Sequence, residues 1–337
     1  MFDIFMYAIN AVLPIILLII LGYALKTIGF FGADFLKTAN KLVFRVCLPA
    51  MLFYNVYHIS NLGAIRWDVV GYCLVIIAVL FALGLLTVLF LVKDKKQKGV
   101  ILQCVFRSNF AIIGLPLSES LGGAEGAAIA AILSAFTIPL YNILAVVSLS
   151  VFVTEGGAKL DGRDILKKII KNPLIIGVCC GLVSLLVRSL LPVNAEGNPV
   201  FSISGSLGFL YTAIGNVSRI ASPLALLVLG GQFEFSAVKG MLKEIAIGTV
   251  WRIVLAPVIG IVAAAVLCHF GVLQFDTTVY PALVALFGSP VAVSSAIMAG
   301  EMDNDEQLAG QLVVWTSVGS MFTTFIMAFA MKYAGLL

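Results

Sequence analysis

Apolar stretches of about twenty residues alternate with short polar connections along almost the whole chain. A helix of that length spans the roughly 30 Å hydrocarbon core of a bilayer, so each stretch predicts one membrane-spanning helix. The fold class that follows is an all-α polytopic membrane protein. Ten spans are expected, over residues 5–26, 35–57, 68–92, 99–121, 124–153, 172–191, 203–231, 242–269, 276–300 and 306–333.

Basic residues gather in two of the polar connections. One is KDKKQK, Lys93 to Lys98, and the other is the longest connection, 154–171, with Lys159 and Lys168. Cytoplasmic loops are enriched in lysine and arginine, and two spans separate these connections, so both are expected in the cytoplasm. Ten spans then place both termini outside the cell membrane.

The second half of the chain repeats the first. LKTANKLVFRVCLPAML, from Leu36, and LYTAIGNVSRIASPLAL, from Leu210, coincide at seven positions with an offset of 174 residues. This predicts two five-helix repeats, 1–153 and 172–337, joined by a cytoplasmic linker at 154–171. Because five is odd, equivalent helices cross the bilayer in opposite directions and the repeats are inverted.

The same offset carries Pro116 onto Pro290 and Gly114 onto Gly288, in the fourth and ninth spans. Proline removes a backbone donor inside a helix, so both spans are predicted to be broken at these prolines and to cross there. Inverted repeats with interrupted helices are typical of secondary transporters, whose binding site lies at the midplane. An ordinary proline kink is the alternative.

The composition supports a membrane protein and restricts its chemistry. Hydrophobic residues make up 61% of the 337 positions and charged residues 11%, whereas soluble domains are about 45–50% apolar. A net charge of +4 without a basic run interleaved with aromatics gives no sign of a nucleic-acid partner. Acidic residues fall in connections or near helix ends, so an acidic catalytic pair is not expected and the protein is predicted not to be an enzyme.

The charged residues inside the spans are Arg45, Arg219 and Arg252, with Arg107 closer to the cytoplasmic entrance. A mid-span arginine without an acidic partner favours an anion. Arg252 would either counter a substrate charge or bond carbonyls freed by a broken helix. Arg45 and Arg219 are repeat equivalents, with a structural or snorkelling role and substrate contact as the alternatives. The predicted substrate-binding residues are Asn109, Gly114, Leu115, Pro116, Asn142, Arg252, Gly288, Ser289, Pro290 and Ser294.

The chain resembles the auxin efflux carrier family, which includes PIN-type carriers and bacterial malate or malonate permeases. The resemblance rests on LGYALKTIGFF, NKLVFRVCLPAMLF, SNFAIIGLPL, PLYNILAV and SPVAVSSAIMAGEM, in this order. It implies a fold related to bile-acid and sodium/proton carriers, with spans 1, 2, 6 and 7 as a scaffold, often dimeric, and spans 3–5 and 8–10 as a moving transport part. It also implies that Asn109, seven residues before the crossover proline, contacts a substrate carboxylate.

A secondary carrier of small organic anions is therefore the leading hypothesis, elevator-type or otherwise, with malate, malonate or auxin-like acids as candidates. An anion channel and a sodium-coupled symporter of the bile-acid type are the alternatives. No cofactor is expected beyond a possible Na⁺, and the expected partners are the substrate, the lipid bilayer and a second copy bound through the scaffold.

Overall fold

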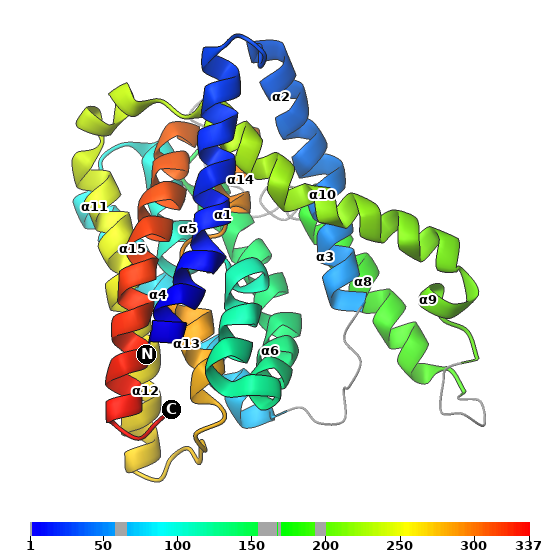
Figure 1. Ribbon diagram of the computed structural model, residues 1–337, viewed down its shortest axis with the longest axis vertical. Coiled ribbons are helices and arrows are strands. Elements are labelled where there is room, and N and C mark those ends of the chain that lie inside the picture. Colours follow the sequence, from blue (N-terminus) through cyan, green and yellow to red (C-terminus); the bar gives the residue numbers. More distant parts are fainter. Residues whose placement is uncertain (1, 58–65, 154–166, 168–169, 193–199) are drawn as a thin grey trace.

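The computed structural model describes residues 2–57, 66–153, 167, 170–192 and 200–337, and these ranges are almost entirely helical (Figure 1). Most of the predicted linker 154–171 lies outside them. The helices are α1 (Phe2–Thr27), α2 (Ala33–Leu42), α3 (Leu48–Tyr57), α4 (Trp67–Leu91), α5 (Lys95–Phe106), α6 (Leu115–Val151), α8 (Pro173–Leu190), α9 (Ile203–Ser206), α10 (Gly208–Gln232), α11 (Leu242–Val250), α12 (Ala256–His269), α13 (Tyr280–Gly288), α14 (Ser294–Glu301) and α15 (Glu306–Tyr333).

The described residues also contain three π-helical turns and one 3₁₀ helix. The π-helical turn η1 (Val43–Cys47) joins α2 to α3, η2 (Phe110–Gly114) leads into α6, and η5 (Trp251–Leu255) joins α11 to α12. The 3₁₀ helix η4 (Phe235–Gly240) precedes α11.

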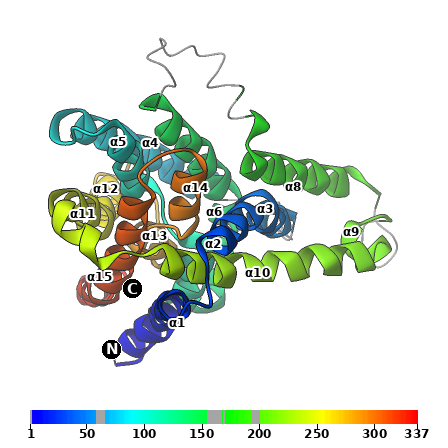
Figure 2. The ribbon, with the colours of Figure 1, turned by 90° about the horizontal axis from the view of Figure 1, so that it is seen from above.

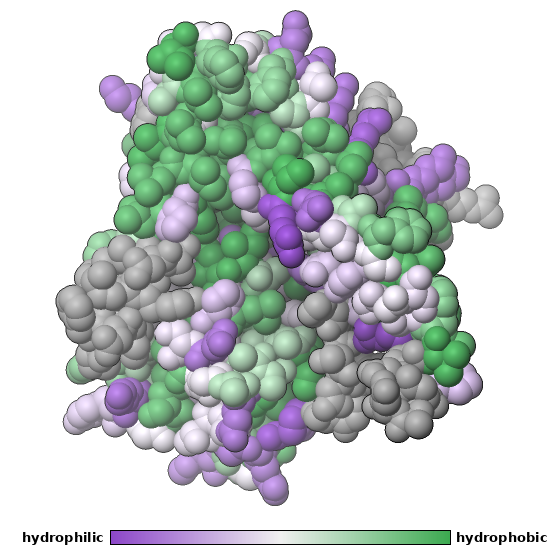
Figure 3. Space-filling model, turned by 45° about the vertical axis from the view of Figure 1, so that its right-hand side comes forward, coloured by the Kyte–Doolittle hydropathy of each residue, from purple (hydrophilic) through white to green (hydrophobic). Residues whose placement is uncertain are grey.

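Six helical stretches of the described chain are long and apolar enough to cross a membrane. Their large side chains remain exposed, as Phe90 at 82% and Leu190 at 84% illustrate, which suits a lipid environment. Hydrophobic residues cover much of the face in Figure 3, with hydrophilic ones gathered toward its edges and lower end. The stretches are Trp67–Leu91, Phe110–Val151, Pro173–Leu190, Gly208–Gln232, Leu242–His269 and Glu306–Tyr333. These establish a helical protein with several spans, while the ten-span inverted repeat stays a prediction.

The helices form two groups. The first, here called the frame, comprises α1, α2, α3, α8 and α10, which pack mainly on one another; the second, the crossing group, comprises α4, α5, α6 and α11 to α15. Seen from above, α8 and α10 extend away from the crossing group (Figure 2). The frame corresponds to the spans that the family resemblance assigns to a scaffold.

Two glycines set the contact between α1 and α10. A Cβ added to Gly22 would overlap the carbonyl oxygen of Leu227, and one added to Gly230 would overlap that of Ile19. Small residues let membrane helices approach closely and gain van der Waals contact. The backbones of α1 and α10 therefore touch at two reciprocal points.

Substituting Gly230 with alanine should lower the free energy of unfolding by about 1–3 kcal/mol, because the added methyl forces the two backbones apart. Gly208 is the matched control, since it lies on the same helix and an added Cβ there meets nothing within 4 Å. Thermal unfolding in detergent should show a lower Tm for Gly230→Ala than for Gly208→Ala. Equal values would mean that α1 and α10 do not depend on this contact.

Two interrupted helices cross inside the crossing group. The first interruption, 107–109, separates α5 from η2, and the second, 289–293, separates α13 from α14. Ser108 and Val291 form an antiparallel bridge, and the backbone N–H of Asn109 donates to the Pro290 carbonyl over 2.8 Å. The two interrupted segments thus satisfy some of each other's backbone hydrogen-bonding groups where helical hydrogen bonds are absent.

The predicted break at Pro116 was wrong. Pro116 lies inside the helix formed by η2 and α6, directly after the π-helical turn η2, and the backbone is helical from Phe110 onward. The interruption precedes it by several residues. Only Pro290 lies within a break, so the two prolines are not structural equivalents.

The two halves of the chain do not keep one constant offset, as the bounds of their helices show. An offset of 174 carries 34–57 onto 208–231, but an offset of 182 is needed to carry 124–151, the part of α6 beyond its kink at Gly123, onto Glu306–Tyr333. The connection between α12 and α13, 270–279, is longer than that between α4 and α5, 92–94. The second half therefore gains residues just before its interrupted helix.

Four connections meet at one end of the molecule, here called the lysine-rich face. Lys96 pairs with Asp303 at 2.8 Å, and the Gln307 amide donates to the Gln232 carbonyl at 2.9 Å. The Lys243 ammonium donates to the carbonyl of Leu91, at the end of α4. Lysines of the described chain near this end are Lys26, Lys37, Lys41, Lys93, Lys95, Lys96, Lys98, Lys239 and Lys243.

Candidate functional site

A cavity of about 50 Å³ lies where the two interruptions cross, between the crossing group and the frame. The interruptions contribute polar residues, and the frame contributes an apolar wall that includes Leu48, Met51 and Leu52 of α3. The lining residues of the crossing group include Arg107, Ser108, Asn109, Ala111, Ile112, Ile138, Tyr141, Asn142, Ala292, Val293 and Ser294. The cavity is polar on the side of the crossing group and mainly apolar on the side of the frame.

Arg107 is the charged group of this cavity, and its side chain is 3% exposed. Its guanidinium donates to Asn142 Oδ1 and to Ser294 Oγ, both at 2.9 Å, and it also contacts Gln103 Oε1 and Met298 Sδ. Among the described residues it has no ion pair with a carboxylate. A buried cation held only by neutral groups leaves a net positive charge for an anion to neutralise.

Asn142 and Ser294 orient this guanidinium. Asn142 also donates its Nδ2 to the Ile138 carbonyl at 2.9 Å, one turn earlier on α6, so its amide is fixed with the oxygen toward Arg107. Both residues line the cavity. Their direct contacts in this structure are to Arg107, which they hold in place.

Asn109 offers a free donor beside the arginine. Its side chain is 4% exposed, and its Nδ2 has no hydrogen-bond partner among the described residues. Its backbone is fixed at both ends, because the N–H donates to Pro290 and the carbonyl accepts from Ile113. A buried donor without a partner is costly, so this position suits a ligand oxygen.

Two helix N-termini begin at the same crossing. The helix formed by η2 and α6 starts after Asn109, and α14 starts at Ser294. The N-terminal peptide groups of a helix carry partial positive charge and unpaired N–H donors. Together with Arg107 they make this side of the cavity favourable for an anion.

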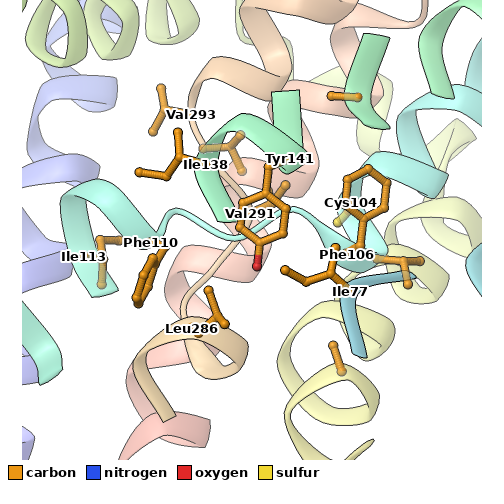
Figure 4. Packing of buried hydrophobic residues seen from close by; sticks show 14 of the residues in the cluster. Ile77, Cys104, Phe106, Phe110, Ile113, Ile138, Tyr141, Leu286, Val291 and Val293 are labelled. Atoms are coloured by element: carbon orange, nitrogen blue, oxygen red, sulfur yellow. The ribbon is translucent and has the colours of Figure 1, made fainter. Parts of the chain in front are cut away.

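Tyr141 completes the polar set. Its ring is buried and its hydroxyl has no partner among the described residues. Figure 4 shows it beside Val291, with Phe106 on one side and Phe110 on the other. The ring thus packs over the crossing and also lines the cavity.

Arg252 lies outside the cavity and bonds to carbonyls. It is fully buried on η5; Nη1 donates to the Val105 carbonyl at 3.3 Å, and Nη2 donates to the Phe287 carbonyl. These carbonyls belong to the C-terminal ends of α5 and α13, where unpaired acceptors and partial negative charge collect. Of the two alternatives that the sequence leaves open for Arg252, the observed contacts are those of bonding freed carbonyls.

The other predicted site residues lie around the crossing but not on the cavity wall. Gly288 packs against Met327, and Ser289 Oγ donates to the Ala285 carbonyl at 2.6 Å. Pro290 contributes its carbonyl to Asn109. Gly114 allows close packing against Phe110, while Leu115 and Pro116 begin α6.

Arg107, Ser108 and Tyr141 are cavity residues that the prediction omitted. Arg107 stands two positions before Asn109 in RSNF, and the expected break at Pro116 placed it too far from the site. Arg45 and Arg219 are exposed on the frame and line no part of the cavity.

Several apolar helices long enough to span a membrane, with a buried polar cavity where two helices are interrupted, define a membrane transporter as the class to compare. The family model described as "Membrane transport protein" matches residues 7–161 and 158–328, so the chain belongs to this family, that of the auxin efflux carriers. The predicted resemblance is confirmed.

Two archaeal relatives carry the name of uncharacterized transporter. The protein from Methanothermobacter thermautotrophicus is 24% identical over 327 residues, which cover 94% of this chain and 96% of the relative. The protein from Methanocaldococcus jannaschii is 24% identical over 258 residues, 75% and 77% of the two chains. The protein is therefore a membrane transporter, and the family match extends over most of the chain.

Proposed function

We propose that this transporter is a secondary carrier of small carboxylate anions, with its binding site at the crossing of the two interrupted helices. The observation that carries the proposal is the buried Arg107 guanidinium without a carboxylate partner in the described chain, beside the unpartnered Asn109 amide. Arginine donors match the two oxygens of a carboxylate. A bound carboxylate would supply the counter-charge of Arg107 and an acceptor for Asn109 Nδ2.

The apolar wall restricts the substrate class further. Arg107 is the one cation among the cavity residues, and the opposite wall carries no charge: it is formed by Leu48, Met51, Leu52, Leu174 and Ala225, with Ser222 as its polar residue. A second ionised carboxylate facing these side chains would be buried without a partner, at a high cost. This favours a monocarboxylate with an apolar body, such as an auxin-like acid, over doubly charged malate or malonate.

A carrier mechanism is supported by the place of the cavity between two packed groups. Its volume of about 50 Å³ is small for an organic acid, so binding requires the frame and the crossing group to move apart. Movement of the crossing group along the frame would expose the site to each side in turn, as in an elevator. A channel would use the same cavity without this motion and is the second candidate.

Arg252 favours a mechanism without sodium at the crossing. In carriers with broken helices, freed carbonyls and helix C-terminal ends commonly hold the coupling cation. Here the carbonyls of Val105 and Phe287 already bind the Arg252 guanidinium. The fixed cation takes the place that sodium would need.

The lysine-rich face supports a cytoplasmic position for the connections between α1 and α2, α4 and α5, α10 and α11, and α14 and α15. The termini would then lie outside the cell membrane. The exposed apolar surface of the frame would be available for a dimer.

Substituting Asn109 with alanine should weaken binding at least roughly tenfold, through the loss of a hydrogen bond to a charged group worth about 1.5–3 kcal/mol. The Tm should stay unchanged, because Asn109 Nδ2 gives up no partner in the described protein. Isothermal titration and thermal unfolding of one purified variant measure both quantities. A lower Tm with unchanged affinity would make Asn109 a packing residue.

A further inference from the structure

A second and larger cavity opens on the lysine-rich face, between the frame and the crossing group. Its volume is about 630 Å³; Lys26, Lys37, Asn40 and Lys41 line its frame side, and Glu301 and Glu306 line the opposite side. It shares no lining residue with the cavity at the crossing. Since α14 runs from Ser294 to Glu301, the two cavities are separated by roughly the 12 Å length of that helix.

Glu301 and Glu306 lie close enough in this cavity to repel each other. Glu301 Oε1 accepts from Asn40 Nδ2 at 3.0 Å, across the boundary between frame and crossing group. Glu306 has a side-chain hydrogen bond with Gln232, but its Oε1 is buried and has no hydrogen-bond partner among the described residues. A negative charge enclosed in this way calls for a donor or a cation.

The cations that line the cavity do not supply this partner. Lys26 on α1 and Lys37 and Lys41 on α2 form no ion pair within 4 Å in the described chain with either carboxylate. The remaining charged residue of the lining is Glu234, which follows α10 and adds a further negative charge. Neither carboxylate is therefore neutralised by an ion pair among the described residues.

Neighbouring residues hold the Glu306 carboxylate in a defined position. A Cβ on Gly300 would lie 2.6 Å from Glu306 Oε1, so the carboxylate rests directly against the glycine. Asn40 is 4% exposed, and its Oδ1 also has no partner in the described chain. Asn40 Oδ1 and Glu306 Oε1 are both acceptors, and one added proton would convert a carboxylate into the donor that the cluster needs.

We propose that Glu306, beside Glu301, binds one proton, which makes this cavity the proton site of the transporter. The proposal rests on the proposed carrier function. Protonation removes a negative charge at the mouth of the path along α14, so an anion approaching from the lysine-rich face is no longer repelled. A monocarboxylate that moves with one proton crosses without net charge.

The pH dependence of thermal stability tests proton binding without any substrate. A carboxyl that binds its proton more tightly when folded contributes stability at low pH and loses it as pH rises. The wild-type Tm should therefore fall by several degrees more between pH 5 and 8 than that of Glu306→Gln, which is neutral throughout. Glu125→Gln, at an exposed position of α6, is the matched control and should keep the wild-type profile.

Parallel profiles for the wild type and Glu306→Gln would overturn the proposal. So would a saturable rise of the wild-type Tm with sodium chloride, but not choline chloride, together with no effect of pH, since the cation would then be sodium. A flattened profile in Glu306→Gln, with the wild-type profile kept in Glu125→Gln, supports the proton site.

Uptake into proteoliposomes separates this proposal from the carrier function. Anion uptake by the wild type should rise severalfold from pH 8 to pH 6, and uptake by Glu306→Gln should be independent of pH. Uptake with the same pH profile in both proteins would overturn the proton site and leave the carrier standing. Absence of uptake for every anion would overturn the carrier, while the thermal profiles would still decide whether a proton binds.

Discussion

Replacing Arg107 with glutamine is expected to lower the affinity for the transported anion by about two orders of magnitude. The substitution removes the cation among the cavity residues and, with it, two hydrogen bonds to a carboxylate, each worth about 1.5–3 kcal/mol. Arg107→Lys keeps the charge but loses the planar fork of donors, so an intermediate loss is expected.

Binding of a carboxylate panel to purified protein, followed by isothermal titration, measures this effect. Arg219→Gln is the matched control, because Arg219 is exposed on the frame and lines no part of the cavity. Tm values recorded on the same samples show whether Arg107→Gln still folds. A folded Arg107→Gln variant with wild-type affinity would exclude Arg107 from substrate binding.

Replacing Arg252 with methionine should reduce stability far more than it changes recognition. The carbonyls of Val105 and Phe287 would lose a charged donor in a fully buried position. Each buried polar group without a partner costs about 1–3 kcal/mol, so the free energy of unfolding should fall by about 3 kcal/mol or more. The ends of α5 and α13 would also repel each other more strongly.

Thermal unfolding of Arg252→Met against Arg45→Met tests this role, because Arg45 is an exposed arginine of the frame. The Arg45 variant should lie within about 0.5 kcal/mol of the wild type. If Arg252→Met kept the wild-type Tm but lost anion binding, Arg252 would act on the substrate instead.

Hydrophobic length was enough to predict a helical chain with several membrane spans, because each bilayer-spanning segment must satisfy its own backbone hydrogen bonds. The place of the first interruption could not be read in this way. Pro116 is the obvious helix breaker, yet it follows the π-helical turn η2 within a continuous helix, and the break at Arg107 to Asn109 contains no proline or glycine. That break depends on the pairing of Ser108 with Val291, far away in sequence.

The location of the cavity could be read from the sequence only in part. Of the residues named from the sequence, Asn109, Asn142 and Ser294 line the cavity, whereas Arg107 also lines it although its sequence position was assigned to the cytoplasmic entrance of its span. The role of Arg252 depends on two carbonyls from different helices, 147 and 35 residues away in sequence. No local pattern reports such contacts.

Counterflow in proteoliposomes tests the central claim most directly. Vesicles loaded with an unlabelled monocarboxylate, such as an auxin-like acid, should take up the labelled acid faster than empty vesicles. That uptake should saturate with concentration, exceed that of malate and disappear in Arg107→Gln. Uptake that rises linearly with concentration and is indifferent to internal substrate would contradict the carrier, and equal uptake by Arg107→Gln would contradict the site.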